Sequence, residues 1–260
     1  METSPPTAAD VERPLPRGIA AIGTSTSSYT GPLTPPEFPL LADLLQADDL
    51  VVLVTPIDHA APKGRLILPQ QQVIREILDA GAQAVVTQVA GLQNVLNTLT
   101  DSPRLVVTDS QAFGEVAELV PENVKLTSFS ILFARKKGLL TQAVAAISAL
   151  DQLHDDDRVL ISEGCSHHRQ CDDIGTVKLP QWISEYTKKK LRFEFTSGGK
   201  FPEALQDYQL IVHCGGCLLN DRTMHHRLAM AAHQEVAITN YGNLIAQING
   251  ILERSVAPIL

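Results

Sequence analysis

The stretch DLVVLVT, residues 49–55, is a continuous apolar run rich in β-branched valine. A strand with one face in water alternates apolar and polar residues, whereas a strand covered on both faces is apolar throughout. This run therefore predicts an inner strand of a parallel sheet whose two faces are covered by helices.

The residues that follow this strand predict the first of those helices. The segment PQQQVIREILDAG (69–81) opens with Pro69 in a favourable first-turn position and ends at Gly81. Strands and helices then alternate. We expect strands at 84–89 and 104–110, helices at 92–99 and around 116–119, a short segment at 124–129, and one long helix with core positions Leu140, Val144, Ile147 and Leu150.

A second series of the same kind follows the acidic stretch DQLHDDD (151–157). Its expected strands are 158–162, 191–195, 208–213 and 235–240, and its expected helices are 180–190, 220–233 with Asn220 as N-cap, and one after Asn240. Such alternation predicts an α/β fold with two domains of βα units and mostly parallel sheets flanked by helices. We expect an extended or disordered tail at 1–39, a first domain at 40–150 and a second at 151–260.

Composition narrows the class of partner. The chain has 260 residues, 44% of them hydrophobic and 19% charged, with a net charge of -8. This acidic balance argues against nucleic acid, which requires a basic surface. No apolar run approaches the roughly 18 residues that span a bilayer, and no secretory signal is recognisable, so we expect no membrane contact and a reducing, cytoplasmic location.

The four cysteines are the residues that carry chemistry. Cys165 follows the strand at 158–162, and Cys214 and Cys217 follow the strand at 208–213. Ligands of open parallel sheets bind at the carboxyl ends of the strands. We therefore expect the loops with Cys165, with the Cys214/Cys217 pair and with Asn240-Tyr241 to converge on one edge of the sheet.

The local sequences CSH (165–167) and HCGGC (213–217) allow three interpretations. Thiolates bind zinc and iron–sulfur clusters, a Cys-x-x-Cys pair can do dithiol redox chemistry, and two glycines can simply form a tight turn. The redox interpretation requires Cys214 at a helix N-terminus, but the next expected helix starts only at Asn220. Around them, Asp172 and Asp173 could cap a turn, Cys171 could be a bystander, and His225, His226 and His233 are expected on a helix surface.

Several segments together resemble the HydF family of FeFe-hydrogenase maturation. These are VLVTPID (52–58), APKGRLILPQ (61–70), VVTDSQAF (106–113), LTSFSILFAR (126–135), CSHH with DDIG (165–175), HCGGCLLN (213–220) and ITNYG (238–242). The pattern Cys-x-His, 45 residues, His-Cys-x-x-Cys resembles the iron–sulfur site of that family. The resemblance implies a dimerisation domain at about 40–150 and a cluster-binding domain at about 151–260.

The resemblance implies a scaffold that binds a 4Fe–4S cluster through Cys165, Cys214 and Cys217. The candidates for the fourth ligand are Asp172, His167, His213 and Cys171. It also implies a homodimer or larger assembly, a transient diiron precursor, and as partners apo-FeFe-hydrogenase and the radical maturases of the same pathway. Family members are also GTPases, but the 260 residues contain no Gly-x-x-x-x-Gly-Lys-Ser/Thr phosphate loop, so GTP hydrolysis does not carry over.

Two alternatives remain open from the residues themselves. The first is a zinc-dependent hydrolase with Cys or His ligands and Asp172 or Asp173 as base. The second is a structural metal-binding module that only mediates dimerisation.

Overall fold

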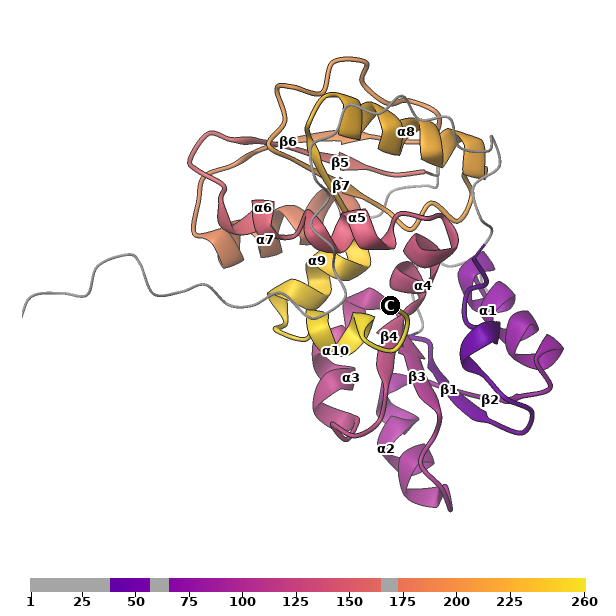
Figure 1. Ribbon diagram of the computed structural model, residues 1–260. Coiled ribbons are helices and arrows are strands. Elements are labelled where there is room, and N and C mark those ends of the chain that lie inside the picture. Colours follow the sequence, from indigo (N-terminus) through magenta and orange to yellow (C-terminus); the bar gives the residue numbers. More distant parts are fainter. Residues whose placement is uncertain (1–37, 57–65, 165–172) are drawn as a thin grey trace, which may run out of the picture. The chain divides into compact units, whose positions relative to one another are not determined.

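The computed structural model describes residues 38–56, 66–164 and 173–260, and these contain two four-stranded parallel sheets (Figure 1). The first sheet has the strand order β2-β1-β3-β4. Its strands are β1 (Leu50–Val54), β2 (Gln83–Thr87), β3 (Leu105–Thr108) and β4 (Leu126–Ser128). The α/β fold class predicted from the sequence is confirmed.

The second sheet repeats this arrangement with the order β6-β5-β7-β8. Its strands are β5 (Arg158–Ser162), β6 (Arg192–Thr196), β7 (Leu210–His213) and β8 (Ala237–Asn240). All the pairings in both sheets are parallel. The apolar runs in β1, β3 and β7 are buried along most or all of their length, as expected for inner strands between helix layers.

Helices cover both faces of the first sheet. The described part of this half contains η1 (Ala42–Leu44), α1 (Leu68–Asp79), α2 (Val89–Thr98), η2 (Ser110–Ala112), α3 (Phe113–Leu119) and α4 (Phe129–Lys136). Helices α1 and α4 contact each other on one face, and α2 and α3 contact each other on the other face (Figure 1). The predicted helices at 69–81, 92–99 and 116–119 are present, with ends that differ by a few residues.

The second half carries its own set of helices. They are α5 (Leu140–Ala145), α6 (Ser148–Asp151), the π-helical turn η3 (Ile174–Lys178), α7 (Leu179–Thr187), α8 (Asp221–His233), α9 (Tyr241–Ile248) and α10 (Leu252–Val256). Asn220 caps α8 by accepting a hydrogen bond from the Thr223 amide, as predicted. None of the helices described is long and apolar enough to cross a membrane.

The single long helix expected around residues 140–150 is wrong. Gly138 has a φ of +68° and ends α4, and the following segment divides into α5 and α6. The break comes at Ala146 and Ile147, where the Ile147 amide bonds the carbonyl of Val144 and so tightens the turn. Most of the predicted core positions still face inward, because two short helices in line preserve the spacing of one: Leu140, Ile147 and Leu150 are buried.

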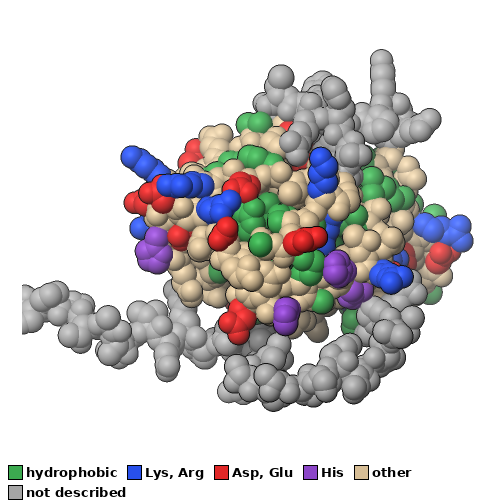
Figure 2. Space-filling model, turned by 90° about the horizontal axis from the view of Figure 1, so that it is seen from above, with side chains coloured by type: hydrophobic (Ala, Val, Ile, Leu, Met, Phe, Trp, Pro, Cys, Tyr) green, Lys and Arg blue, Asp and Glu red, His purple; other side chains and the backbone are tan. Residues whose placement is uncertain are grey.

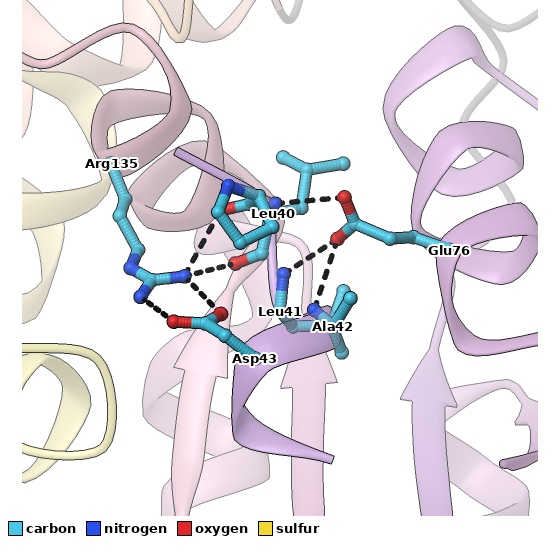
Figure 3. A network of polar contacts seen from close by, with 7 residues as sticks. Leu40, Leu41, Ala42, Asp43, Glu76 and Arg135 are labelled. Atoms are coloured by element: carbon cyan, nitrogen blue, oxygen red, sulfur yellow. Dashed lines mark hydrogen bonds and ion pairs between the residues drawn. The ribbon is translucent and has the colours of Figure 1, made fainter. Parts of the chain in front are cut away.

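A polar network fixes the start of the described chain against the first sheet's helices (Figure 3). The Glu76 carboxylate accepts hydrogen bonds from the amides of Leu40, Leu41 and Ala42 at 3.0, 2.6 and 3.3 Å. Arg135 of α4 donates to the carbonyl of Pro39 and forms an ion pair with Asp43. The pair holds the pKa of the Asp43 carboxyl below its usual value. These contacts attach residues 39–43 to both α1 and α4.

The two sheets meet at the ends of their last strands. Ser128 ends β4 and caps α4, and Asn240 ends β8 and caps α9. The Asn240 side-chain amide donates to the Ser130 carbonyl at 2.9 Å, and the Gly242 amide donates to the Ser130 hydroxyl at 3.2 Å. The carboxyl edge of each sheet therefore lies beside the carboxyl edge of the other.

Candidate metal centre

The cysteine pair lies at the switch point of the second sheet. β6 lies beside β5 and β8 lies beside β7, so the order of the strands reverses between β5 and β7. Ligands of open parallel sheets commonly bind at the carboxyl ends of the strands at such a point. Cys214 is the first residue after β7, and its amide donates to the Ser162 carbonyl at the end of β5. The ends of β5, β7 and β8 therefore lie side by side, as predicted, whereas Cys165 itself lies outside the described residues.

The sulfur of Cys214 already sits among donors that favour a negative charge. It accepts hydrogen bonds from the Gly164 amide at 3.0 Å and the Gly216 amide at 3.4 Å. Gly164 is the last described residue before Cys165, so the chain leaves the described region beside this sulfur. Burial raises the pKa of the Cys214 thiol to about 11, opposed by these two amides and reinforced by Cys217 and Glu163.

Two glycines make this approach sterically feasible. Gly216 has a φ of +66°, a conformation that residues with a side chain rarely adopt. A Cβ on Gly164 would lie 2.7 Å from the Leu219 side chain, so any larger residue would push the two loops apart. Among the three interpretations of HCGGC, the tight turn is therefore present, and it is used to bring backbone amides onto a sulfur.

Helix α4 of the first half supports the cysteine turn from below. The turn is so close to α4 that a Cβ on Gly215 would lie 3.6 Å from the Cα of Ser130 and 3.5 Å from the Cβ of Phe133. Lys137 is nearly buried, and its ammonium donates to the Leu219 carbonyl at 2.8 Å and to Asp221 at 2.5 Å. The loop that carries the thiols is therefore held by residues from both halves of the chain.

His213 is fully buried and is engaged through both ring nitrogens. Arg227 lies 2.8 Å from Nε2, and the Cys214 carbonyl lies 2.7 Å from Nδ1. Because a guanidinium can only donate, Nε2 must accept, and Nδ1–H must donate to the carbonyl. Burial lowers the pKa of His213 to about 4, with a further contribution from Arg227. In this arrangement neither nitrogen has a lone pair directed at a metal.

The other predicted residues fall into two groups. Cys165, Cys171, His167 and Asp172 lie outside the described residues. Asp173 is buried and caps η3, with its carboxylate accepting from the Thr176 amide and hydroxyl at 2.9 Å each. On α8, His226 and His233 are exposed and His225 is half-buried.

On the face in Figure 2, basic and acidic side chains are interspersed rather than gathered into a basic surface.

Three residues of the site were not identified from the sequence. Arg227 and Lys137 fall in segments with a helical pattern, where charged residues are common. Their role in the site follows only from the packing. Glu163 is buried at the end of β5, and a Cβ on Gly175 would lie 2.5 Å from its carboxylate and 2.6 Å from the Tyr241 hydroxyl. An acidic residue directly after an apolar strand and two residues before a cysteine was the available signal.

The donor chemistry fits a metal that prefers sulfur. Cys214 and Cys217 are the two cysteines among the described residues, and backbone amides directed at sulfur tune thiolate-bound clusters. Within the described residues no three His, Cys, Asp or Glu side chains gather closely enough to hold a single metal ion. The site as described therefore provides two thiols.

Fold and site together define an α/β protein of two linked parallel-sheet units, one of which presents a thiol pair at its switch point. Residues 40–138 match the hydrogen maturase F dimerization domain, and residues 141–258 match the hydrogen maturase F tetramerization domain. The chain belongs to the hydrogen maturase F (HydF) family. No curated protein matches the chain.

The boundary between the two matched domains falls between residues 138 and 141, where the chain passes from α4 to α5. Helix α5 thus falls in the second domain, and it packs against β8 with the Thr239 hydroxyl donating to the Ala143 carbonyl at 2.8 Å. Family membership assigns the chain to hydrogenase maturation and to a family whose domains self-associate.

Proposed function

We propose that this chain is a scaffold for FeFe-hydrogenase maturation that binds a 4Fe–4S cluster through Cys165, Cys214 and Cys217. The observation that carries the proposal is the Cys214 sulfur, held by the amides of Gly164 and Gly216 at the switch point of the second sheet. Such amide–sulfur bonds stabilise a thiolate, and thiolates anchor iron–sulfur clusters. Cys165 directly follows Gly164 in the sequence, which supports it as the third anchor.

The fourth iron is the proposed point of exchange. Asp172, His167 and Cys171 remain candidates for its ligand, and Glu163 adds a buried carboxylate whose charge acts on Cys214. His213 is less suited, because both of its nitrogens have protein partners. A weak oxygen or nitrogen ligand would leave this iron open to a diiron precursor supplied by radical maturases and passed on to apo-hydrogenase in the cytoplasm.

The hydrolase alternative receives less support from the geometry. A general base needs a carboxylate directed at water, but Asp173 uses its carboxylate to cap η3. Asp172, the other candidate base, lies outside the described residues. The scaffold proposal does not require a base at either position.

The test is anaerobic reconstitution of the full chain with iron and sulfide, followed by EPR of the reduced protein. We expect bound iron with acid-labile sulfide and a cluster signal. Cys165→Ala, Cys214→Ala and Cys217→Ala should each abolish stable assembly, while Cys171→Ala, the matched control, should retain the cluster.

Other results would contradict the proposal in distinct ways. A chain that binds zinc but no sulfide would favour the hydrolase or the structural module. Full iron content in Cys214→Ala would remove that thiol from the ligand set. Loss of the cluster in Cys171→Ala would make Cys171 the fourth ligand in place of an exchangeable one.

A further inference from the structure

Arg227 is a buried cation without a carboxylate partner among the residues that the structure describes. Only 1% of the residue is exposed, and its partners are His213 Nε2, the Ser162 hydroxyl at 3.4 Å and the Gly198 carbonyl at 2.6 Å. The guanidinium also lies 4.9 Å from the centre of the Phe201 ring. All these partners are neutral, so no group among them balances the charge.

Other arginines of the described chain are balanced in ordinary ways. Five of them form ion pairs with carboxylates: Arg75, Arg104, Arg135, Arg158 and Arg192. Arg254 donates to carbonyls at the end of α3 and in the loop after it, where the helix dipole is negative. Removing a charge from water costs several kcal/mol unless an opposite charge compensates for it. Arg227 therefore points to an anion that is bound nearby.

The contacts of Arg227 lead directly to the cysteine turn. Its Nη1 donates to His213, and His213 donates to the carbonyl of Cys214, so three groups form one chain of hydrogen bonds. Burial lowers the pKa of Arg227, and the charge of Cys214 acts in the opposite direction. The turn is thus held in place by the same side chain that supplies the positive charge.

We propose that Arg227 is the counter-charge for the anionic, thiolate-bound group at Cys214 and Cys217, and that it positions this group through His213. This inference rests on the proposed cluster. Addition of one electron to a 4Fe–4S core makes the bound group more negative by one unit, and a nearby buried cation stabilises that state. Arg227 therefore favours reduction and raises the reduction potential of the site.

The test is an EPR-monitored redox titration of the reconstituted full chain, with dithionite as reductant, in four proteins. The wild type is compared with Arg227→Met, which keeps the apolar stem but removes the charge, and with Arg227→Lys, which keeps the charge. Arg254→Met is the matched control, because it removes an arginine that also has neutral partners but lies on α10. We expect a more negative potential in Arg227→Met only.

Each outcome decides between charge and geometry. A cluster lost in Arg227→Met but retained in Arg227→Lys supports the role of Arg227 as counter-charge. Loss of the cluster in both variants shows that the hydrogen-bonding geometry of the guanidinium matters rather than its charge, and this overturns the proposal. An unchanged potential in Arg227→Met, or an equal shift in Arg254→Met, also overturns it. If the wild type holds no iron and sulfide, the proposed function itself has failed, and this inference fails with it.

Discussion

The first sheet and the second sheet are built on one plan but end differently. In each sheet the second strand along the chain is an edge strand beside the first, and the third and fourth strands follow on the other side. The edge strands β2 and β6 also have the same pattern of exposed and half-buried residues. In the first sheet β3 ends at Thr108 and is followed by Asp109, whereas in the second β7 ends at His213 and is followed by Cys214. The framework is shared, and the chemistry lies in the loops at its carboxyl edge.

The layers around the two sheets differ at one further place. In the first half α2 connects β2 to β3, whereas residues 197–209 connect β6 to β7 without a helix. Gly198 and Phe201 of this connection are partners of Arg227, which reaches them from α8. Replacement of a helix by a loop thus makes room for a long cationic side chain beside the thiols. The difference shows that two sheets of the same plan can differ in a buried charge beside the end of an inner strand.

The largest expected effect concerns the corresponding edge strands β2 and β6. Val86 in β2 and Phe195 in β6 occupy the same position of their strands and are 45% and 38% exposed. Exposed apolar residues on an edge strand favour pairing with another chain. Since Val86 lies in the dimerization domain, we expect Val86→Asp to halve the dimer mass measured by light scattering, whereas Phe195→Asp should leave the dimer and remove only larger assemblies.

The control for this comparison is Val177→Asp, which places the same charge at a residue that is 43% exposed outside the strands. It should leave the mass unchanged. A dimer that persists in Val86→Asp would show that the contact lies on another surface of the first domain.

The second prediction compares His213, which ends β7, with Thr108, which ends the corresponding strand β3 and does not titrate. Unfolded His213 binds a proton near pH 6.5, but in the folded protein its pKa is about 4. Between these values the unfolded state binds more protons, so the free energy of unfolding of the metal-free protein should fall as the pH falls, by about 3 kcal/mol in total. Urea unfolding at several pH values measures this slope.

His213→Gln should flatten this slope, because glutamine can replace both hydrogen bonds without titrating. His233→Gln removes an exposed histidine and should keep the wild-type slope. If the slope of His213→Gln equals that of the wild type, the acid sensitivity comes from carboxylates elsewhere.

The comparison also shows what the sequence could predict. Continuous apolar runs identified the inner strands β1, β3 and β7, since burial on both faces leaves a direct pattern in the residues. The cysteine turn could be predicted because HCGGC (213–217) comes at the end of an apolar strand. Arg227 and Lys137 could not be identified as site residues, because a charged residue in or beside a helix is ordinary, and only the packing shows that these two are buried. Of the three, only Glu163, directly after an apolar strand and two residues before a cysteine, had a signal in the sequence. The break between α5 and α6 was also missed, because two short helices in line keep the periodicity of one.

The third effect concerns the contact between the two halves. Lys137, the C-cap residue of α4, is nearly buried and donates hydrogen bonds to the Leu219 carbonyl and to Asp221. Lys137→Met should lower the free energy of unfolding by about 2 kcal/mol, because a hydrogen-bonded charge is lost. The amide of Leu219, which bonds the Gly216 carbonyl, should also exchange faster.

Arg75→Met is the matched control for Lys137→Met. It removes a cation from an exposed pair with Asp79 on α1, so the free energy of unfolding should change much less than in Lys137→Met. Equal effects in the two variants would mean that α4 does not support the thiol loop.

The smallest effect tests the turn itself. The corresponding turn after β3 forms the 3-10 helix η2 with ordinary side chains, but the turn after β7 needs a φ of +66° at Gly216. A Cβ there would also lie 3.3 Å from the Met224 sulfur. Gly216→Ala should therefore cost about 1–2 kcal/mol from backbone strain and should move the Gly216 amide away from the Cys214 sulfur.

The control is Gly199→Ala, where no atom lies within 4 Å and φ is not positive, and its effect should be within about 0.5 kcal/mol of zero. Thermal unfolding of the metal-free proteins measures the strain, and the rate of iron release from the reconstituted proteins measures the loss of the amide. If Gly216→Ala is strained but releases iron at the wild-type rate, the glycine serves only the turn, and the amide of Gly164 alone supports the sulfur.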